Sequence, residues 1–247
     1  MFFQADPGTS WAGSIAACME YPHNRPYTAD DLVRIITLLR DPVNGCPWDK
    51  VQTHTSIRMN FLEEAYEAVD ALDLDDPVLM CEELGDVLMQ VAFHTCMEQE
   101  TGRFTWEQVC DGVCQKLIER HPNIFGTQPG YEGITDWDAL KNKEKGRRTL
   151  ADDLESVPRA MPALMRAAKL QKRAARHGAA LQGADAAALA DAAENLQTAQ
   201  PASAQAEQAV GELLFAAANL ARQAGVDPEQ ALQKANEAFC TVAGPVA

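Results

Sequence analysis

The sequence predicts an all-α protein folded as a helical bundle. It is rich in Ala, Leu, Glu and Gln, which favour helices, whereas only 6% of its 247 residues are aromatic. Alternating runs of Val, Ile and Thr, which would indicate strands, are few. Because 47% of the residues are hydrophobic, the chain can form one large or two modest domains with buried cores.

The first expected helix begins near residue 28. Thr28 can cap it, with Asp31 three residues later, and the sequence then carries an apolar stripe of helical spacing. The stripe consists of Leu32, Ile35, Ile36 and Leu39. The pairs Asp41-Pro42 and Asn44-Gly45 end this helix and open a turn-rich loop, "GCPWDK".

Four more helices are expected in the first part of the chain. Their approximate ranges are residues 55–72, 77–99, 105–121 and 135–146. Pro122 and Gly126 end the segment "CQKLIERHPNIFG". Helices joined by such short turns predict a bundle.

The composition changes after residue 150, where the chain becomes rich in Ala. There "AVGELLFAAANLARQAG" repeats the order of small, acidic and apolar residues in "ELGDVLMQVAFHTCMEQ", with Gly211-Glu212 in the place of Gly85-Asp86. This similarity predicts an internal duplication.

Charge and composition argue against several classes of protein. The formal net charge of −15 argues against stable nucleic-acid binding, which needs a basic surface. The seven Cys include no Cys-x-x-Cys pair, so neither a disulfide framework nor a zinc site is expected. No segment is typical of a signal peptide or a membrane span, so we expect a cytoplasmic protein.

Two neighbouring helices carry closely spaced carboxylates. In "EEAYE", Glu64 and Glu67 are three residues apart, and Glu63 and Glu67 are four apart. In "EELGD", Glu83 and Asp86 are again three apart. Residues at these spacings lie one helical turn apart, where like charges repel unless something neutralises them.

The short break "DLDDP" places the two acidic segments opposite each other. Asp76 is expected to cap the second helix and Pro77 to occupy its first position. A connection this short makes the helices antiparallel neighbours. Counting outward from it sets Glu67 opposite Glu83 and Glu64 opposite Asp86, which gathers the four carboxylates at one level of the hairpin.

Carboxylates without a neighbouring His favour a hard cation. We therefore expect Mg²⁺, for which Mn²⁺ can substitute, rather than a di-iron centre. The alternative to a metal site is an acidic helix face that is exposed to solvent. Such a site suits attack of water on a phosphoanhydride, with Glu63 binding a second metal or orienting the water. The local cations available to a polyphosphate are Lys116, Arg120, Lys141, Lys143, Arg147 and Arg148.

Five motifs, in order and spacing, resemble the MazG family of nucleoside triphosphate pyrophosphohydrolases. They are "GCPWDKVQTHTS", "LEEAYEAVDAL", "EELGDVLMQVAFH", "KLIERHPNIFG" and "DWDALKNKEK". The resemblance covers about residues 28–247. It implies an all-α fold, usually dimeric, and Mg²⁺-dependent cleavage of NTPs and dNTPs between the α- and β-phosphates, giving NMP and pyrophosphate in a house-cleaning role.

Carried onto this chain, the resemblance implies four metal ligands and one catalytic residue. The ligands are Glu64, Glu67, Glu83 and Asp86, and Glu63 has a catalytic or second-metal role. The candidate substrate-binding residues are Trp48, Lys50, Lys116, Arg120, Trp137 and Lys141. Trp48 has an alternative interpretation as a packing anchor.

The second half departs from the family pattern. After Gly178 the chain has Ala-Ala-Leu where long members commonly have Phe-Asp-Trp, and the two acidic motifs are reduced to "DAAEN" (residues 191–195) and "AVGE" (residues 209–212). Ala209 cannot ligate a metal. We therefore expect an N-terminal extension over residues 1–26, a catalytic domain over 27–150 and, over 151–247, a degenerate repeat used for packing or dimerisation.

Two rival readings remain. The acidic hairpin could be a solvated surface of a non-catalytic helical interaction module, although all five acidic positions are present in the first half. Alternatively, the hydrolase could act on a narrow substrate such as dCTP or dUTP. The sequence holds no motif that reads a base and would decide between a narrow and a broad substrate range.

Overall fold

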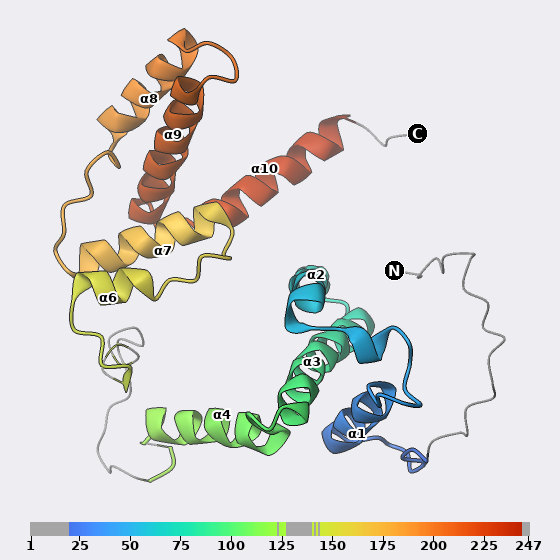
Figure 1. Ribbon diagram of the computed structural model, residues 1–247. Coiled ribbons are helices and arrows are strands. Elements are labelled where there is room, and N and C mark those ends of the chain that lie inside the picture. The colour runs from blue at the N-terminus through green and yellow to red at the C-terminus, as the bar shows by residue number, and fades with distance from the viewer. Residues whose placement is uncertain (1–19, 123, 127–139, 141, 143, 244–247) are drawn as a thin grey trace. The chain divides into compact units, whose positions relative to one another are not determined.

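The computed structural model describes residues 20–122, 124–126, 140, 142 and 144–243 (Figure 1). Every regular element in these ranges is a helix, which confirms the all-α prediction. The elements of the first part are α1 (Ala29–Leu39), the short 3₁₀ helix η1 (Asp49–Val51), α2 (His54–Leu74), α3 (Pro77–Glu100) and α4 (Trp106–Arg120). Those of the second part are α6 (Leu150–Glu155), α7 (Ala163–Arg176), α8 (Ala186–Thr198), α9 (Ala204–Gln223) and α10 (Pro228–Ala243).

The chain divides into two compact units, Met1–Gly133 and Ile134–Ala247. In the first unit the predicted helices lie within two residues of their expected bounds. The helix expected over 135–146 falls within the second unit, and most of it lies outside the described residues. Among the helices described, none is both long and apolar enough to cross a membrane.

Side-chain caps set the starts of the helices in the first unit. The Thr28 hydroxyl accepts a hydrogen bond from the Asp31 amide, and the Asp31 carboxylate accepts one from the Thr28 amide. The same reciprocal pattern joins Thr53 to Ser56 at the start of α2. These caps satisfy amide groups that have no partner within the helix, and the Thr28 cap confirms the sequence prediction.

The α2–α3 hairpin turns sharply at two residues. Asp75 adopts the left-handed conformation, with φ of 52°, and ends α2. Asp76 then caps α3 by accepting hydrogen bonds from the Val78 and Leu79 amides, and Pro77 is the first helical residue, as predicted. This two-residue turn fixes the register of α2 against α3.

The core of the first unit lies between α1, α2, α3 and α4. Its buried members are Ile36, Ile57, Ala92, Phe93, Cys96, Met97 and Trp106. Arg40, only 8% exposed, ties the loop before α2 to this core. Its guanidinium binds the Glu100 carboxylate on α3 and donates to the Asp49 carbonyl oxygen.

The second unit is built around the closely packed pair α8 and α9, with α7 against α9. Asp153 on α6 is 1% exposed and forms ion pairs with Arg173 and Arg176 on α7. A buried carboxylate needs such partners, so these pairs join α6 to α7. The predicted internal duplication stays a prediction.

Candidate metal centre

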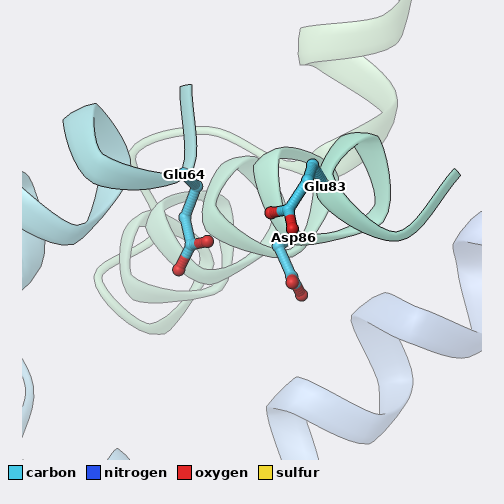
Figure 2. A group of neighbouring side chains, drawn as sticks. All are labelled: Glu64, Glu83 and Asp86. Atoms are coloured by element: carbon cyan, nitrogen blue, oxygen red, sulfur yellow. The ribbon is translucent and has the colours of Figure 1, made fainter. Parts of the chain in front are cut away.

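Three carboxylates from α2 and α3 meet midway along the hairpin. Figure 2 shows the Glu64 carboxylate, from α2, beside those of Glu83 and Asp86, from α3. One oxygen of each lies within 4.8 Å of the other two, and all three side chains are half-buried. Glu64 lies opposite the Asp86 turn because the two-residue connection sets this register. In the part of the chain that the structure describes, this is the one group of potential ligands of that kind.

Glu67 lies at the margin of this cluster, and Glu63 directly precedes Glu64 on α2. Glu67 is exposed and lies outside the group of three, but its charge acts on both Glu64 and Glu83. Glu63 is also exposed. The structure thus gathers three of the four expected ligands and places the fourth, Glu67, close by.

Burial and neighbouring negative charges raise the pKa values of two members of the cluster. The pKa of Glu64 is raised, first by burial and then by the charges of Asp86 and Glu67. The pKa of Glu83 is also raised, by burial and then by Glu67 and Asp86. A cation placed among these oxygens would remove the repulsion, and oxygen-only donors fit a hard ion such as Mg²⁺ or Mn²⁺.

Gln90, which the sequence analysis does not single out, extends this cluster. It lies on α3, four residues after Asp86, and is 7% exposed. Its Nε2 donates a hydrogen bond to Glu64 Oε1 at 3.5 Å. The spacing of Glu83, Asp86 and Gln90, three and then four residues, is the signal that could have identified it.

A second polar group joins α2 to α3 at the end of the hairpin away from the turn. His54 Nδ1 lies 2.7 Å from His94 Nδ1, and the two rings stack with centroids 5.0 Å apart. His54 Nε2 lies 2.5 Å from Glu98 Oε1, and Glu98 also binds Arg103. We call these four residues the histidine clamp. Glu98 is 6% exposed, so its two partners compensate for its burial.

The candidate substrate-binding residues lie on other elements. Trp48, 45% exposed, precedes η1, and Lys50 lies within it. Lys116 and Arg120 lie one turn apart on α4. Trp137 and Lys141 lie outside the described residues.

Comparison with known proteins extends this picture. A family model described as the MazG nucleotide pyrophosphohydrolase domain matches residues 52–125, which include the three carboxylates and Gln90. The nucleoside triphosphate pyrophosphohydrolase of Escherichia coli (strain K12) is 41% identical over 219 residues, covering 85% of this chain and 83% of that protein. A nucleoside triphosphate pyrophosphohydrolase/pyrophosphatase MazG of Thermotoga maritima is 39% identical over 212 residues, covering 85% and 82%. A nucleoside triphosphate pyrophosphohydrolase of Mycobacterium tuberculosis is 35% identical over 151 residues, covering 60% and 46%.

Proposed function

The chain belongs to the MazG family of nucleotide pyrophosphohydrolases, and from this premise we propose that it hydrolyses nucleoside triphosphates to NMP and pyrophosphate, with Mg²⁺ as cofactor. Membership makes it a hydrolase acting on phosphoanhydrides. The observation that carries the proposal is the meeting of Glu64, Glu83 and Asp86 within 4.8 Å. The substrates would be NTPs and dNTPs.

Glu64, Glu83 and Asp86 would hold the cation, with Glu67 as a fourth ligand. When bound, Mg²⁺ neutralises charge on the phosphates and increases the acidity of water. The chain's own carboxylates create the negative site that draws the cation in. Glu63, on the exposed side of the same α2 turn, would orient the attacking water or contribute to a second cation site.

Cationic side chains would hold the polyphosphate, because the chain's net charge of −15 repels it. Lys116 and Arg120 on α4 and Lys50 on η1 are proposed for this role, together with Lys141. Trp48, nearly half exposed, and Trp137 are proposed to contact the nucleotide. The overall reaction consumes one water, breaks the α–β bridging bond and releases pyrophosphate.

We assign catalysis to residues 27–150 and, of the two roles expected for residues 151–247, packing rather than dimerisation, with residues 1–26 as an extension. A hydrolase that clears unwanted NTPs and dNTPs would serve a house-cleaning role in the cytoplasm. Stable nucleic-acid binding is not part of the proposal, because the net charge opposes it.

We also propose that the protein is a homodimer. Four apolar side chains on α2 and α3 are 40% to 53% exposed: Val69, Leu72, Leu84 and Leu88. Apolar side chains at these spacings on two adjacent helices suit the corresponding face of a second copy. Sedimentation should show a dimer that the double change Leu84→Glu and Leu88→Glu dissociates. Leu232→Glu, at an exposed leucine of α10, is the control and should leave the dimer intact. A monomeric wild type would refute the dimer.

Turnover of the eight common NTPs and dNTPs, with and without Mg²⁺, tests the proposed reaction. The products NMP, NDP, pyrophosphate and phosphate are separated. We expect NMP and pyrophosphate in equal amounts, and only with Mg²⁺. NDP and phosphate would show that another bond is cleaved, and no product from any substrate would favour the non-catalytic reading. The pattern of rates distinguishes a broad enzyme from one restricted to dCTP or dUTP.

A further inference from the structure

The side-chain amide of Gln90 has a hydrogen-bond partner at its nitrogen but none at its buried oxygen. Its Nε2 donates to Glu64 Oε1 at 3.5 Å, whereas its Oε1 is buried and accepts no hydrogen bond. The orientation of the amide follows from the contact with Glu64. Turning the amide over would place a carbonyl oxygen against a carboxylate oxygen, and two acceptors repel.

An unpartnered buried carbonyl oxygen destabilises a folded protein. An apolar side chain of similar size, such as Met, would fill the same space on α3 without that cost. The stability of the fold therefore does not explain a glutamine at position 90. The neighbouring residues do not explain the glutamine either. Ala92 and Phe93, two and three residues later on α3, are buried core residues whose side chains cannot bind a polar amide.

The position of Gln90 relates it to the three carboxylates. It lies four residues after Asp86 and seven after Glu83, so all three share one face of α3. Gln90 is the most buried of the three and lies on the core side of the cluster. Its hydrogen bond crosses to α2 and reaches the carboxylate of Glu64.

We propose that Gln90 is a positioning residue for the metal centre, which holds the Glu64 carboxylate through Nε2 and accepts through Oε1 a hydrogen bond from a water that enters with the cation. This inference rests on the cation site of the proposed function. Side chains that hydrogen-bond to a metal ligand orient it, and their loss reduces metal affinity. Mg²⁺ commonly retains several waters, which need acceptors in the surrounding protein.

The test compares Gln90→Met with wild type in the full chain and without nucleotide. Calorimetric titration with Mg²⁺ and Mn²⁺ should show a Kd about 10- to 100-fold higher in the variant. Thermal unfolding of the metal-free protein should occur at the same temperature or a higher one, because the variant removes a buried unpartnered oxygen. A purely structural role predicts the reverse: lower stability with unchanged cation affinity.

Gln171 on α7 offers a matched control. It is 1% exposed, its Nε2 donates to the Phe215 carbonyl oxygen, and its Oε1 is also buried without a partner. It contacts α9 of the second unit rather than a carboxylate of the cluster. Gln171→Met should therefore leave the Kd for Mg²⁺ and Mn²⁺ unchanged.

The outcomes separate this inference from the proposed function. If wild type binds Mg²⁺ and hydrolyses NTPs but Gln90→Met binds the cation equally well, the role of Gln90 is refuted and the function stands. If wild type neither binds a cation nor hydrolyses NTPs, both fail. If Gln90→Met does not fold, the side-chain amide resonances of Gln90 in wild type decide: a shift that saturates with Mg²⁺ binding supports the proposal, and no shift overturns it.

Discussion

At the scale of single residues, the cluster brings together carboxylates that repel one another, and the proposed cation would relieve this repulsion. Asp86 contributes to the raised pKa of both Glu64 and Glu83. Asp86→Asn should therefore leave the metal-free protein as stable as wild type or slightly more so. The loss of a ligand should lower kcat by at least about 100-fold, the upper end of what a group that only orients a ligand costs. Steady-state turnover and thermal unfolding measure both effects.

A nearby glutamate controls for a change of charge on α3. Glu82→Gln alters an exposed side chain outside the cluster and should retain turnover. Glu67→Gln tests the fourth proposed ligand, which lies outside the group of three, and should also abolish turnover. Full activity in both Asp86→Asn and Glu67→Gln would remove the metal hypothesis.

The raised pKa values of Glu64 and Glu83 also predict how stability depends on pH. Each carboxyl binds its proton more tightly in the folded metal-free protein than in the unfolded chain. Their contribution to stability is therefore present below the usual glutamate pKa and is lost as the pH rises through the raised value. Saturating Mg²⁺ should remove this loss, because it binds the ionised form.

Unfolding temperatures with EDTA and with Mg²⁺, measured between about pH 4 and pH 8, test this linkage. The stabilisation by Mg²⁺ should grow as the pH rises and should be much smaller in Asp86→Asn. A stabilisation by Mg²⁺ that is the same at every pH, or the same in the variant, would contradict the assignment of the cation to these carboxylates.

Sequence reasoning identifies the carboxylates but neither the burial nor the contacts of their polar neighbours. Glu64, Glu83 and Asp86 follow from helical spacing and from a two-residue turn whose Asp76 and Pro77 are recognisable in the sequence. Gln90 stands inside the apolar run "VLMQVAFH", where the sequence does not show which side chains become buried. His54 and His94 are 40 residues apart, so their contact depends on the folded hairpin.

At the scale of the helix pair, α2 and α3 are joined at both ends, with the carboxylates between. One end is the Asp75–Asp76 turn, and the other is the histidine clamp. The pKa of His94 is lowered, first by burial and then by the charge of His54, while Glu98 partly opposes this. Because only one proton can lie between the two Nδ1 atoms, a second proton would break the contact.

The clamp predicts an acid-dependent loss of stability. A histidine whose pKa is lower in the folded protein than in the unfolded chain favours the unfolded chain as the pH falls from about 6.5 through the lowered value. This change has the opposite sign to that of Glu64 and Glu83. His94→Phe keeps a ring beside Phe61 and removes the titrating group.

Urea unfolding of the metal-free protein between about pH 5 and pH 8 measures this effect. His94→Phe should be about 1 kcal/mol less stable than wild type at pH 8, where the hydrogen bond to His54 is lost. The deficit should shrink as the pH falls. His23→Phe, at an exposed histidine, should show no such trend. A deficit for His94→Phe that is constant with pH would refute the role of His94.

At the scale of the whole molecule, the second unit also contains a closely packed helix pair, α8 and α9, which the sequence predicts to be a degenerate copy of the acidic hairpin. The pair α8 and α9 borders a pocket of about 610 Å³, whose lining includes Asp191, Asn195 and Glu212. Ala209 is only 2% exposed. A group of three carboxylates at this place would need an acidic side chain in its position. Within the described part of the second unit, no group of three potential ligands occurs. This agrees with the proposal that the working site lies in the first unit.

Glu212→Gln tests this division of labour. Glu212 is exposed, and its Oε1 accepts a hydrogen bond from Gln208 Nε2 at 2.8 Å, one turn earlier on α9. A glutamine keeps an acceptor for that bond, so α9 should remain intact and the free energy of unfolding should stay within about 0.5 kcal/mol of wild type. We expect kcat and KM to be unchanged, in contrast to Asp86→Asn. A fall in kcat as large as that of Asp86→Asn would mean that the second unit also takes part in catalysis, since the predicted duplication sets Glu212 in the place of Asp86.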